Sequence, residues 1–104
     1  MSKNKVLVII GAGKHQVSLI RAARKLEYYT LAVDRDPEAE GFSYSDDWIV
    51  EDAYDYDRIF EAIRKKTDLS KVAGIMTQAA RGCVLTTAKI SEKLRLRHLN
   101  GKTA

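Results

Sequence analysis

The stretch VLVIIGAGKHQ, residues 6–16, sets the fold, because five consecutive β-favouring apolar residues run directly into a glycine turn. A continuous apolar run of this length is typical of a strand buried on both faces of a parallel sheet. The two glycines let the backbone turn sharply and approach a ligand closely, and a helix pattern begins at Gln16. The unpaired N–H groups and positive dipole end of such a helix favour an anion. The stretch therefore predicts an anion site at the carboxyl end of the first strand.

Length and composition indicate one domain. With 104 residues, 45% of them hydrophobic, the chain can bury a single core but is smaller than the two domains that enclose a substrate in most α/β enzymes. We therefore expect residues 1–104 to form one domain, as part of something larger. One cysteine (Cys83) and two histidines (His15 and His98) predict no metal site. No apolar segment has the length of a signal peptide or a membrane span, so a cytoplasmic protein without membrane contact is expected.

The net charge of +4 comes from the end of the chain, where five basic residues and one acidic residue follow Ala88. A basic end of this kind can bind nucleic acid. However, Lys89 and Lys93 are spaced as on the solvated face of a helix, and no aromatic residue lies among these charges for a base to stack on. The pattern therefore favours a solvated helix end, and nucleic acid is not an expected partner.

The first half of the chain alternates short apolar segments with one helical pattern. Strands are predicted over residues 5–10, 30–34 and 48–50. A helix is predicted over residues 16–27, with an apolar stripe against the sheet formed by Leu19, Ile20, Ala23 and Leu26. Residues 37–47 contain Gly41 and no helical stripe, so they are predicted to form a loop.

The second half repeats this alternation. Asp55 is predicted to cap a helix over residues 56–66, which ends in three cations that favour the helix dipole. A buried strand is predicted over residues 72–76 and a last helix over residues 83–94. The fold class predicted is three-layer, Rossmann-like α/β, with right-handed crossovers and an open parallel sheet of about four strands covered on both faces.

In such a sheet the ligand crevice lies outside the carboxyl ends of the strands. Three loops meet there, and they contain the candidate site residues Gly11, Gly13, Lys14, His15, Gln16, Asp34, Gln78 and Arg81. The guanidinium fork of Arg81 can clamp a carboxylate or a phosphate. His15 has no visible partner for acid–base work, so ligand contact or solvent exposure is favoured and no catalytic residue is assigned.

Each of these features also has a structural alternative. The two glycines can simply make a tight turn, and Asp34 with Asp36 can end a strand, since aspartates are common in turns. Arg81 can pair with acidic residues at the surface. These alternatives stay open at the level of sequence.

Two well-known phosphate-binding motifs do not fit the glycine stretch. The dinucleotide fingerprint G-x-G-x-x-G has its third glycine replaced by Gln16, and a P-loop would need a glycine where Val8 stands. Asp34 nevertheless lies about 20 residues further on, where an acidic residue would meet a ribose hydroxyl. A free-standing module that binds NAD or another nucleotide is therefore the alternative function.

Several segments carry a family resemblance through their order along the chain. They are residues 8–13 (VIIGAG), Gln16, residues 19–23 (LIRAA), residues 33–37 (VDRDP), Gly41, residues 45–47 (SDD), residues 72–77 (VAGIMT) and residues 94–96 (LRL). Together they resemble the N-terminal, pre-ATP-grasp domain of the ATP-grasp ligases, as in the large chain of carbamoyl-phosphate synthetase, biotin carboxylase and the glycinamide-ribonucleotide synthetases. The resemblance extends over nearly the whole chain.

The resemblance implies an ATP-dependent ligase that activates a carboxylate as an acyl-phosphate, which an amine or a thiol then attacks. In such a ligase, Gly11, Gly13 and Gln16 would line the side of a small carboxylate or phosphorylated substrate, with Asp34, Gln78 and Arg81 beside them. ATP and Mg²⁺ would bind between later subdomains, so no cofactor is expected in this domain.

The sequence stops at Ala104, about where the chain of the family crosses into its ATP-binding region. No residues here match the carboxylates that hold magnesium or the lysines that hold phosphates. We therefore expect the ATP-grasp domains to be partners of this chain, which alone would not catalyse ligation. An exposed strand edge, or a face that such domains would cover, leaves homo-oligomerisation open.

Overall fold

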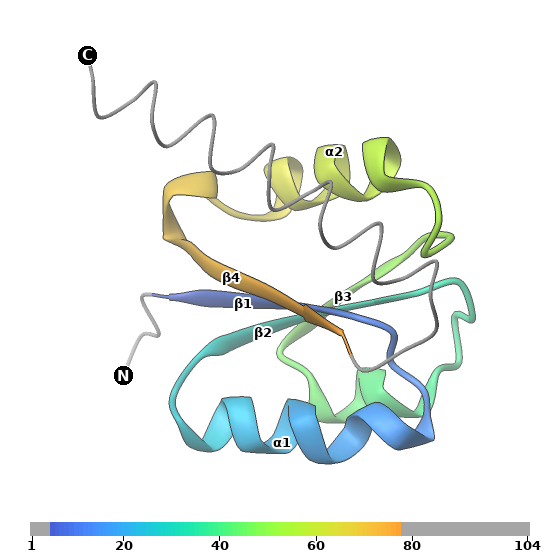
Figure 1. Cartoon of the computed structure of the whole chain (residues 1–104), viewed down its shortest axis with the longest axis vertical. Helices are drawn as coiled ribbons and strands as arrows, with labels where there is room; N and C mark the ends of the chain where they lie inside the picture. Colours follow the sequence, from blue (N-terminus) through green and yellow to red (C-terminus); the bar gives the residue numbers. More distant parts are fainter. Residues whose placement is uncertain (1–4, 78–104) are drawn as a thin grey trace.

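Four strands form one parallel sheet in the computed structural model, which describes residues 5–77. They are β1 (Val6–Ile10), β2 (Tyr29–Asp34), β3 (Asp47–Val50) and β4 (Val72–Thr77), in the spatial order β3-β2-β1-β4 (Figure 1). Each apolar run predicted to be a strand is one, and the boundaries differ by one residue. The predicted Rossmann-like parallel sheet is confirmed.

Within residues 5–77, two α-helices cover the sheet from opposite sides, as Figure 1 shows: α1 (Val17–Lys25) and α2 (Tyr56–Lys66). Three short 3-10 helices lie in the connections: η1 (Lys14–Gln16), η2 (Glu40–Tyr44) and η3 (Leu69–Lys71). The fold therefore has the three predicted layers. Among the described helices, none is long and apolar enough to span a membrane.

The two cores meet at β1, whose five residues are all buried. Its even-numbered residues pack in one cluster with Ile59 and Ile63 of α2, whereas its odd-numbered residues pack with Ile20 and Ala23 of α1. Burial on both faces explains why β1 is a continuous apolar run without alternation. This central position also makes β1 the rigid support of the glycine turn that follows it.

The first helix is shorter than predicted, and the prediction that Leu26 faces the sheet is wrong. The α-helix ends at Lys25, and Leu26 is 73% exposed. The cause is a Schellman motif: the N–H of Tyr28 donates to Ala23 O (3.1 Å) and the N–H of Glu27 to Arg24 O (2.9 Å). Glu27 therefore has a positive φ of 68°, and the chain turns into β2 before Leu26 can reach the sheet.

The predicted loop over residues 37–47 contains η2, so the loop prediction is wrong over residues 40–44. Gly41 and Phe42 are buried there, and the ring of Phe42 stacks on that of Trp48 with centroids 5.7 Å apart. The segment has no helical apolar stripe, and instead the buried residues Gly41 and Phe42 pack it against distant parts of the chain.

The helix α2 has the predicted bounds and the predicted cap, because a carboxylate oxygen of Asp55 accepts the N–H of Arg58 (3.2 Å). The last predicted helix, over residues 83–94, lies outside the described residues.

Candidate ligand site at the glycine loop

The glycine loop, residues 11–16, leaves the sheet at the carboxyl end of β1. Gly11 has a φ of 99°, which strongly favours glycine, and its N–H donates to Val33 O of the neighbouring β2 (2.7 Å). On the other side of β1, Ile10 pairs with Thr77, the last residue of β4. The loop therefore starts from the middle of the sheet edge where parallel α/β folds bind ligands.

Asp34 at the end of β2 holds this loop through both of its carboxylate oxygens. Oδ2 accepts the N–H of Ala12 (2.9 Å) and Oδ1 accepts the N–H of Asp36 (3.0 Å). Ala12 is fully buried, so without Asp34 its N–H would lose its hydrogen bond in a dry environment. The structure thus brings Asp34 to the predicted site, and there its carboxylate binds the protein's own backbone.

Gly41 braces the loop from the opposite side, and sequence reasoning did not assign it to the site. Its N–H donates to Ala12 O (2.6 Å), and a Cβ at this position would lie 2.6 Å from the same oxygen. Only glycine fits this close approach without a shift. A glycine inside a polar segment was the one signal in the sequence, and it carries no information about its distant partner.

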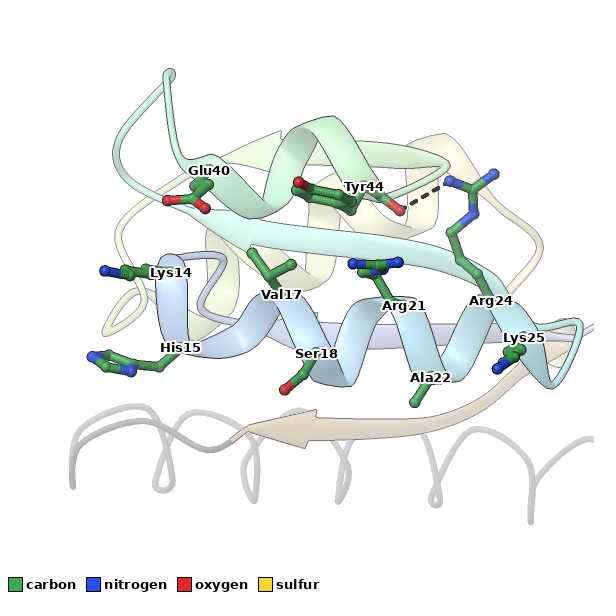
Figure 2. A pocket seen from close by; sticks show the side chains of 10 residues that line it. All are labelled: Lys14, His15, Val17, Ser18, Arg21, Ala22, Arg24, Lys25, Glu40 and Tyr44. Atoms are coloured by element: carbon green, nitrogen blue, oxygen red, sulfur yellow. Dashed lines mark hydrogen bonds between the residues drawn. The ribbon is translucent and has the colours of Figure 1, made fainter.

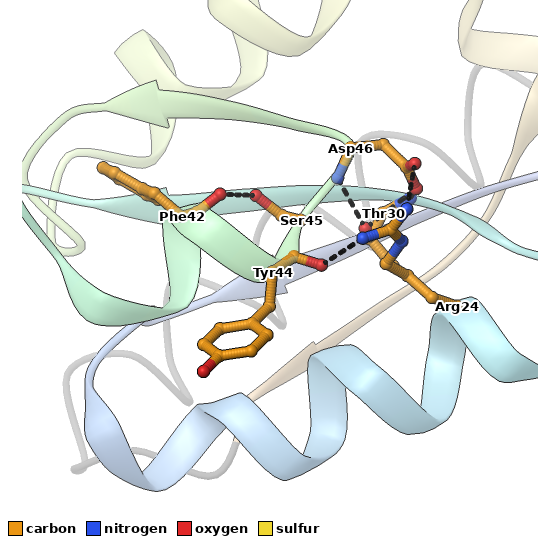
Figure 3. Close-up of polar contacts among 6 residues, drawn as sticks. All are labelled: Arg24, Thr30, Phe42, Tyr44, Ser45 and Asp46. Atoms are coloured by element: carbon orange, nitrogen blue, oxygen red, sulfur yellow. Dashed lines mark hydrogen bonds and ion pairs between the residues drawn. The ribbon is translucent and has the colours of Figure 1, made fainter.

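The segment that carries Gly41 is itself anchored at its other end by Asp46 (Figure 3). The Oδ2 atom of Asp46 accepts the N–H (2.8 Å) and the hydroxyl (3.0 Å) of Thr30, while Arg24 donates to Tyr44 O (3.1 Å) and lies 3.5 Å from Asp46 Oδ1. Burial, together with the carboxylates of Asp47 and Asp46, raises the pKa of the neighbouring Tyr29. These contacts hold η2, and with it Gly41, against α1 and β2.

Three backbone donors of the glycine loop are available for a ligand. Within residues 5–77, the N–H groups of Gly13, Lys14 and His15 donate no hydrogen bond, whereas the N–H of Gln16 donates to Gly13 O (3.0 Å). Free donors are expected in the first turn of a helix. The side chains of Lys14 and His15 are exposed beside them. The arrangement can accept a carboxylate or a phosphate group.

Gln16 occupies the position of the third glycine of a dinucleotide fingerprint, and its side chain is buried. Only 9% of the residue is exposed, and its Oε1 would lie 3.2 Å from a Cβ on Gly13. The carboxamide thus fills the space beneath Gly13. It makes no hydrogen bond within the part of the chain that the structure describes.

The remaining predicted site residues, Gln78 and Arg81, lie outside the described residues. Between residues 5 and 77, the structure brings together no group of three or more His, Cys, Asp or Glu side chains that could hold a metal ion. The described part of the candidate site is therefore a loop with three available backbone N–H donors, flanked by the exposed side chains of Lys14 and His15.

No protein-family model and no curated protein sequence matches the chain. Several solved structures are similar to it. Phosphoribosylglycinamide synthetase from Anaerococcus prevotii is 28% identical with a TM-score of 0.72, over 86% of this chain and 22% of that one. N5-carboxyaminoimidazole ribonucleotide synthetase from Thermotoga maritima is 21% identical with a TM-score of 0.67, over 86% of this chain and 23% of that one. N5-carboxyaminoimidazole synthetase from Staphylococcus aureus, in complex with ADP, is 15% identical with a TM-score of 0.69, over 89% of this chain and 23% of that one.

The chain spans less than a quarter of the length of each of these synthetases. The two likenesses below 25% identity support the fold, and the likeness to phosphoribosylglycinamide synthetase adds sequence similarity over most of this chain. The chain therefore resembles, in fold and over most of its length, the Rossmann-like N-terminal domain of the ATP-grasp ligases.

Proposed function

We propose that this chain is the substrate-side, N-terminal domain of an ATP-dependent ligase of the ATP-grasp superfamily, which joins a carboxylate to an amine or a thiol. The observation that carries the proposal is the glycine loop, with three available N–H donors at the carboxyl edge of the sheet. The 28% identity to phosphoribosylglycinamide synthetase supports the superfamily. In this role the chain binds substrate and does not catalyse ligation alone.

The substrate class follows from the donors of the loop. Backbone N–H groups and the ammonium of Lys14 recognise negative charge, so the ligand is a small carboxylate or a phosphorylated molecule. Asp34 and Gly41 hold Ala12 by its N–H and its carbonyl, which fixes the loop before any ligand arrives. A fixed loop loses little conformational entropy on binding, and this increases affinity.

ATP and Mg²⁺ belong to other domains in this proposal. Within residues 5–77, no group of three or more His, Cys, Asp or Glu side chains is placed to hold a metal ion on its own. In this proposal the partners of the chain are the ATP-grasp domains. The more specific resemblance to the carbamoyl-phosphate synthetase large chain stays a prediction, because the similar structures above are those of phosphoribosylglycinamide synthetase and N5-carboxyaminoimidazole ribonucleotide synthetase.

The alternative, a free-standing module for NAD or another nucleotide, requires Asp34 to bind a ribose. Each carboxylate oxygen of Asp34 already accepts a backbone N–H, from Ala12 and from Asp36. A structural role accounts for this aspartate without a nucleotide. The geometry therefore supports the ligase domain better.

The test is a titration of the isotope-labelled 104-residue chain with inorganic phosphate and with acetate, followed by amide chemical shifts at constant ionic strength. We expect saturable shifts at Gly13, Lys14 and His15, and weaker phosphate binding by Lys14→Ala than by the control Lys65→Ala on α2. NAD is titrated in parallel. Unchanged amides at residues 13–15 would contradict the proposed anion site, and saturable NAD binding that Asp34→Asn abolishes would favour the alternative.

A further inference from the structure

A second feature of the surface is a groove along α1, which we call the basic groove. Its polar lining comes from three elements (Figure 2): Lys14 and His15 of η1, Arg21, Arg24 and Lys25 of α1, and Glu40 and Tyr44 of η2. Short side chains, those of Val17, Ser18 and Ala22, lie between the cations. The groove runs from the glycine loop to the far end of the helix, so most of it lies away from the proposed substrate site.

The positive charge of this groove is largely uncompensated. Residues 14–25 contain four lysines or arginines and one histidine but no acidic residue. Arg24 is neutralised by Asp46. Within residues 5–77, Lys14 and Lys25 form no ion pair, and Arg21 lies over the Tyr44 ring, 5.7 Å from its centroid. Arg21 and Lys25 are also one helical turn apart, where like charges repel.

The rest of the described chain is charged in the opposite sense. Residues 26–77 carry thirteen acidic and six basic side chains. The basic groove is thus a local concentration of positive charge, whereas the rest of the described chain is net acidic. A patch of this kind attracts an acidic partner and orients it as it approaches.

We propose that the basic groove is a docking surface for an acidic segment of a partner protein. Its cations extend over about 16 Å of helix axis, from Lys14 to Lys25, which matches about three turns of a partner helix or five residues of an extended segment. The short side chains between the cations give apolar residues of the segment a surface to pack on. The inference does not depend on the proposed function, because Arg21 and Lys25 lie well beyond the glycine loop.

The composition of the groove favours a protein segment over nucleic acid. Glu40 lines the groove, and its carboxylate repels a continuous row of phosphates but can pair with a cation in a protein segment of mixed charge. Single-stranded nucleic acid also needs exposed aromatic rings for stacking. The aromatic ring in the groove, that of Tyr44, already has the Arg21 guanidinium over one face, 5.7 Å from its centroid.

The experiment measures fluorescence anisotropy with a labelled peptide of three Glu-Glu-Ala-Leu repeats, and with oligothymidylate of equal charge, on the 104-residue chain. We expect the peptide to bind more tightly than the oligothymidylate. Raising the salt from about 50 to 300 mM should weaken the peptide complex several-fold, since exposed ion pairs are screened. The double variant Arg21→Glu/Lys25→Glu should weaken it about tenfold, the effect of roughly 1.4 kcal/mol.

The matched control is Lys65→Glu/Lys71→Glu, which changes the net charge equally on exposed lysines outside the groove and should weaken binding by less than about twofold. Arg21→Gln/Lys25→Gln repeats the test without charge reversal, and thermal unfolding verifies that each variant folds. Equal loss in the groove variant and the control would overturn the proposal, as would tighter binding of oligothymidylate or absence of peptide binding at low salt. Sedimentation that shows self-association removed only by the groove variant would assign the groove to a second copy instead.

Discussion

Gly41 has no room for a side chain. A Cβ there would lie 2.6 Å from Ala12 O and 2.8 Å from Ile20 Cδ1, and the first of these is backbone that cannot rotate away. We expect Gly41→Ala to push η2 off the glycine loop and to lower the free energy of unfolding by about 2 kcal/mol. Urea denaturation followed by circular dichroism measures the loss.

Gly74→Ala is the matched control for this substitution. A Cβ at Gly74 would lie 3.7 Å from Leu7 Cδ1, an ordinary contact, and alanine costs less conformational entropy than glycine in a strand. The control should therefore be neutral or stabilising by up to about 1 kcal/mol. Equal destabilisation by both alanines would show that the close approach at Gly41 is not special.

Asp34 connects the end of β2 to the glycine loop, so its removal should cost stability. Asp34→Ala leaves the buried N–H of Ala12 and the N–H of Asp36 without their acceptor, and we expect a loss of about 2 kcal/mol in urea denaturation. The control Asp36→Ala removes a single bond to the N–H of Glu38 at the exposed surface and should cost less. Equal stability of wild type and Asp34→Ala would remove the structural role and reopen the ribose interpretation.

At the scale of elements, α1 ends under strain at Glu27. The residue has a φ of 68° in the C′ position of the Schellman motif, where a side chain other than that of glycine is disfavoured. Glu27→Gly should relieve this conformation and stabilise the protein by about 0.5–1 kcal/mol. Thermal unfolding measures the change, and Glu27→Ala is the control because alanine keeps the unfavourable φ without relief. If Glu27→Gly lowered the stability instead, contacts of the Glu27 side chain would stabilise the protein by more than the positive φ costs.

The strands and α2 could be predicted from the sequence because their signals are local. The apolar run of β1 and the cap at Asp55 depend on residues that are adjacent in the chain. The early end of α1 and the short helix η2 could not be predicted in this way. Leu26 continues the apolar spacing, and only the hydrogen bonds of the turn at Glu27 show that the helix has already ended.

The candidate site, too, could be predicted where its signals are local and could not where they depend on residues distant in the sequence. Its position followed from strand order, since the glycine loop and Asp34 both stand at carboxyl ends of parallel strands. The role of Asp34 did not follow, because a carboxylate that binds the N–H of Ala12 and one that binds a ribose have the same sequence signature. Gly41 was missed for a related reason: its partner, Ala12, is distant in the sequence.

For the molecule as a whole, the proposed function assigns substrate binding to this chain and the chemistry of ligation to other domains. Residues 13–15 offer three backbone N–H donors to the proposed substrate, and within residues 5–77 no group of three or more His, Cys, Asp or Glu side chains could hold a metal ion. Acyl-phosphate formation requires metal ions or cations that neutralise the transferred phosphoryl group and hold it in line with the attacking oxygen. Backbone N–H donors alone can bind an anion, but they do not supply these groups.

We therefore expect the 104-residue chain to form no measurable acyl-phosphate from ATP and small carboxylates, even where the amides of residues 13–15 report that a carboxylate is bound. Trapping of acyl-phosphates as hydroxamates, together with ADP release, measures the reaction, and a purified ATP-grasp ligase acting on its own substrate provides the positive control. Because binding and turnover are measured on the same sample, a failure to bind the carboxylate can be distinguished from a failure to form the acyl-phosphate. Binding without turnover is the result expected of a substrate-side domain, whereas ATP-dependent hydroxamate formation by this chain would contradict the assignment of the chemistry to other domains.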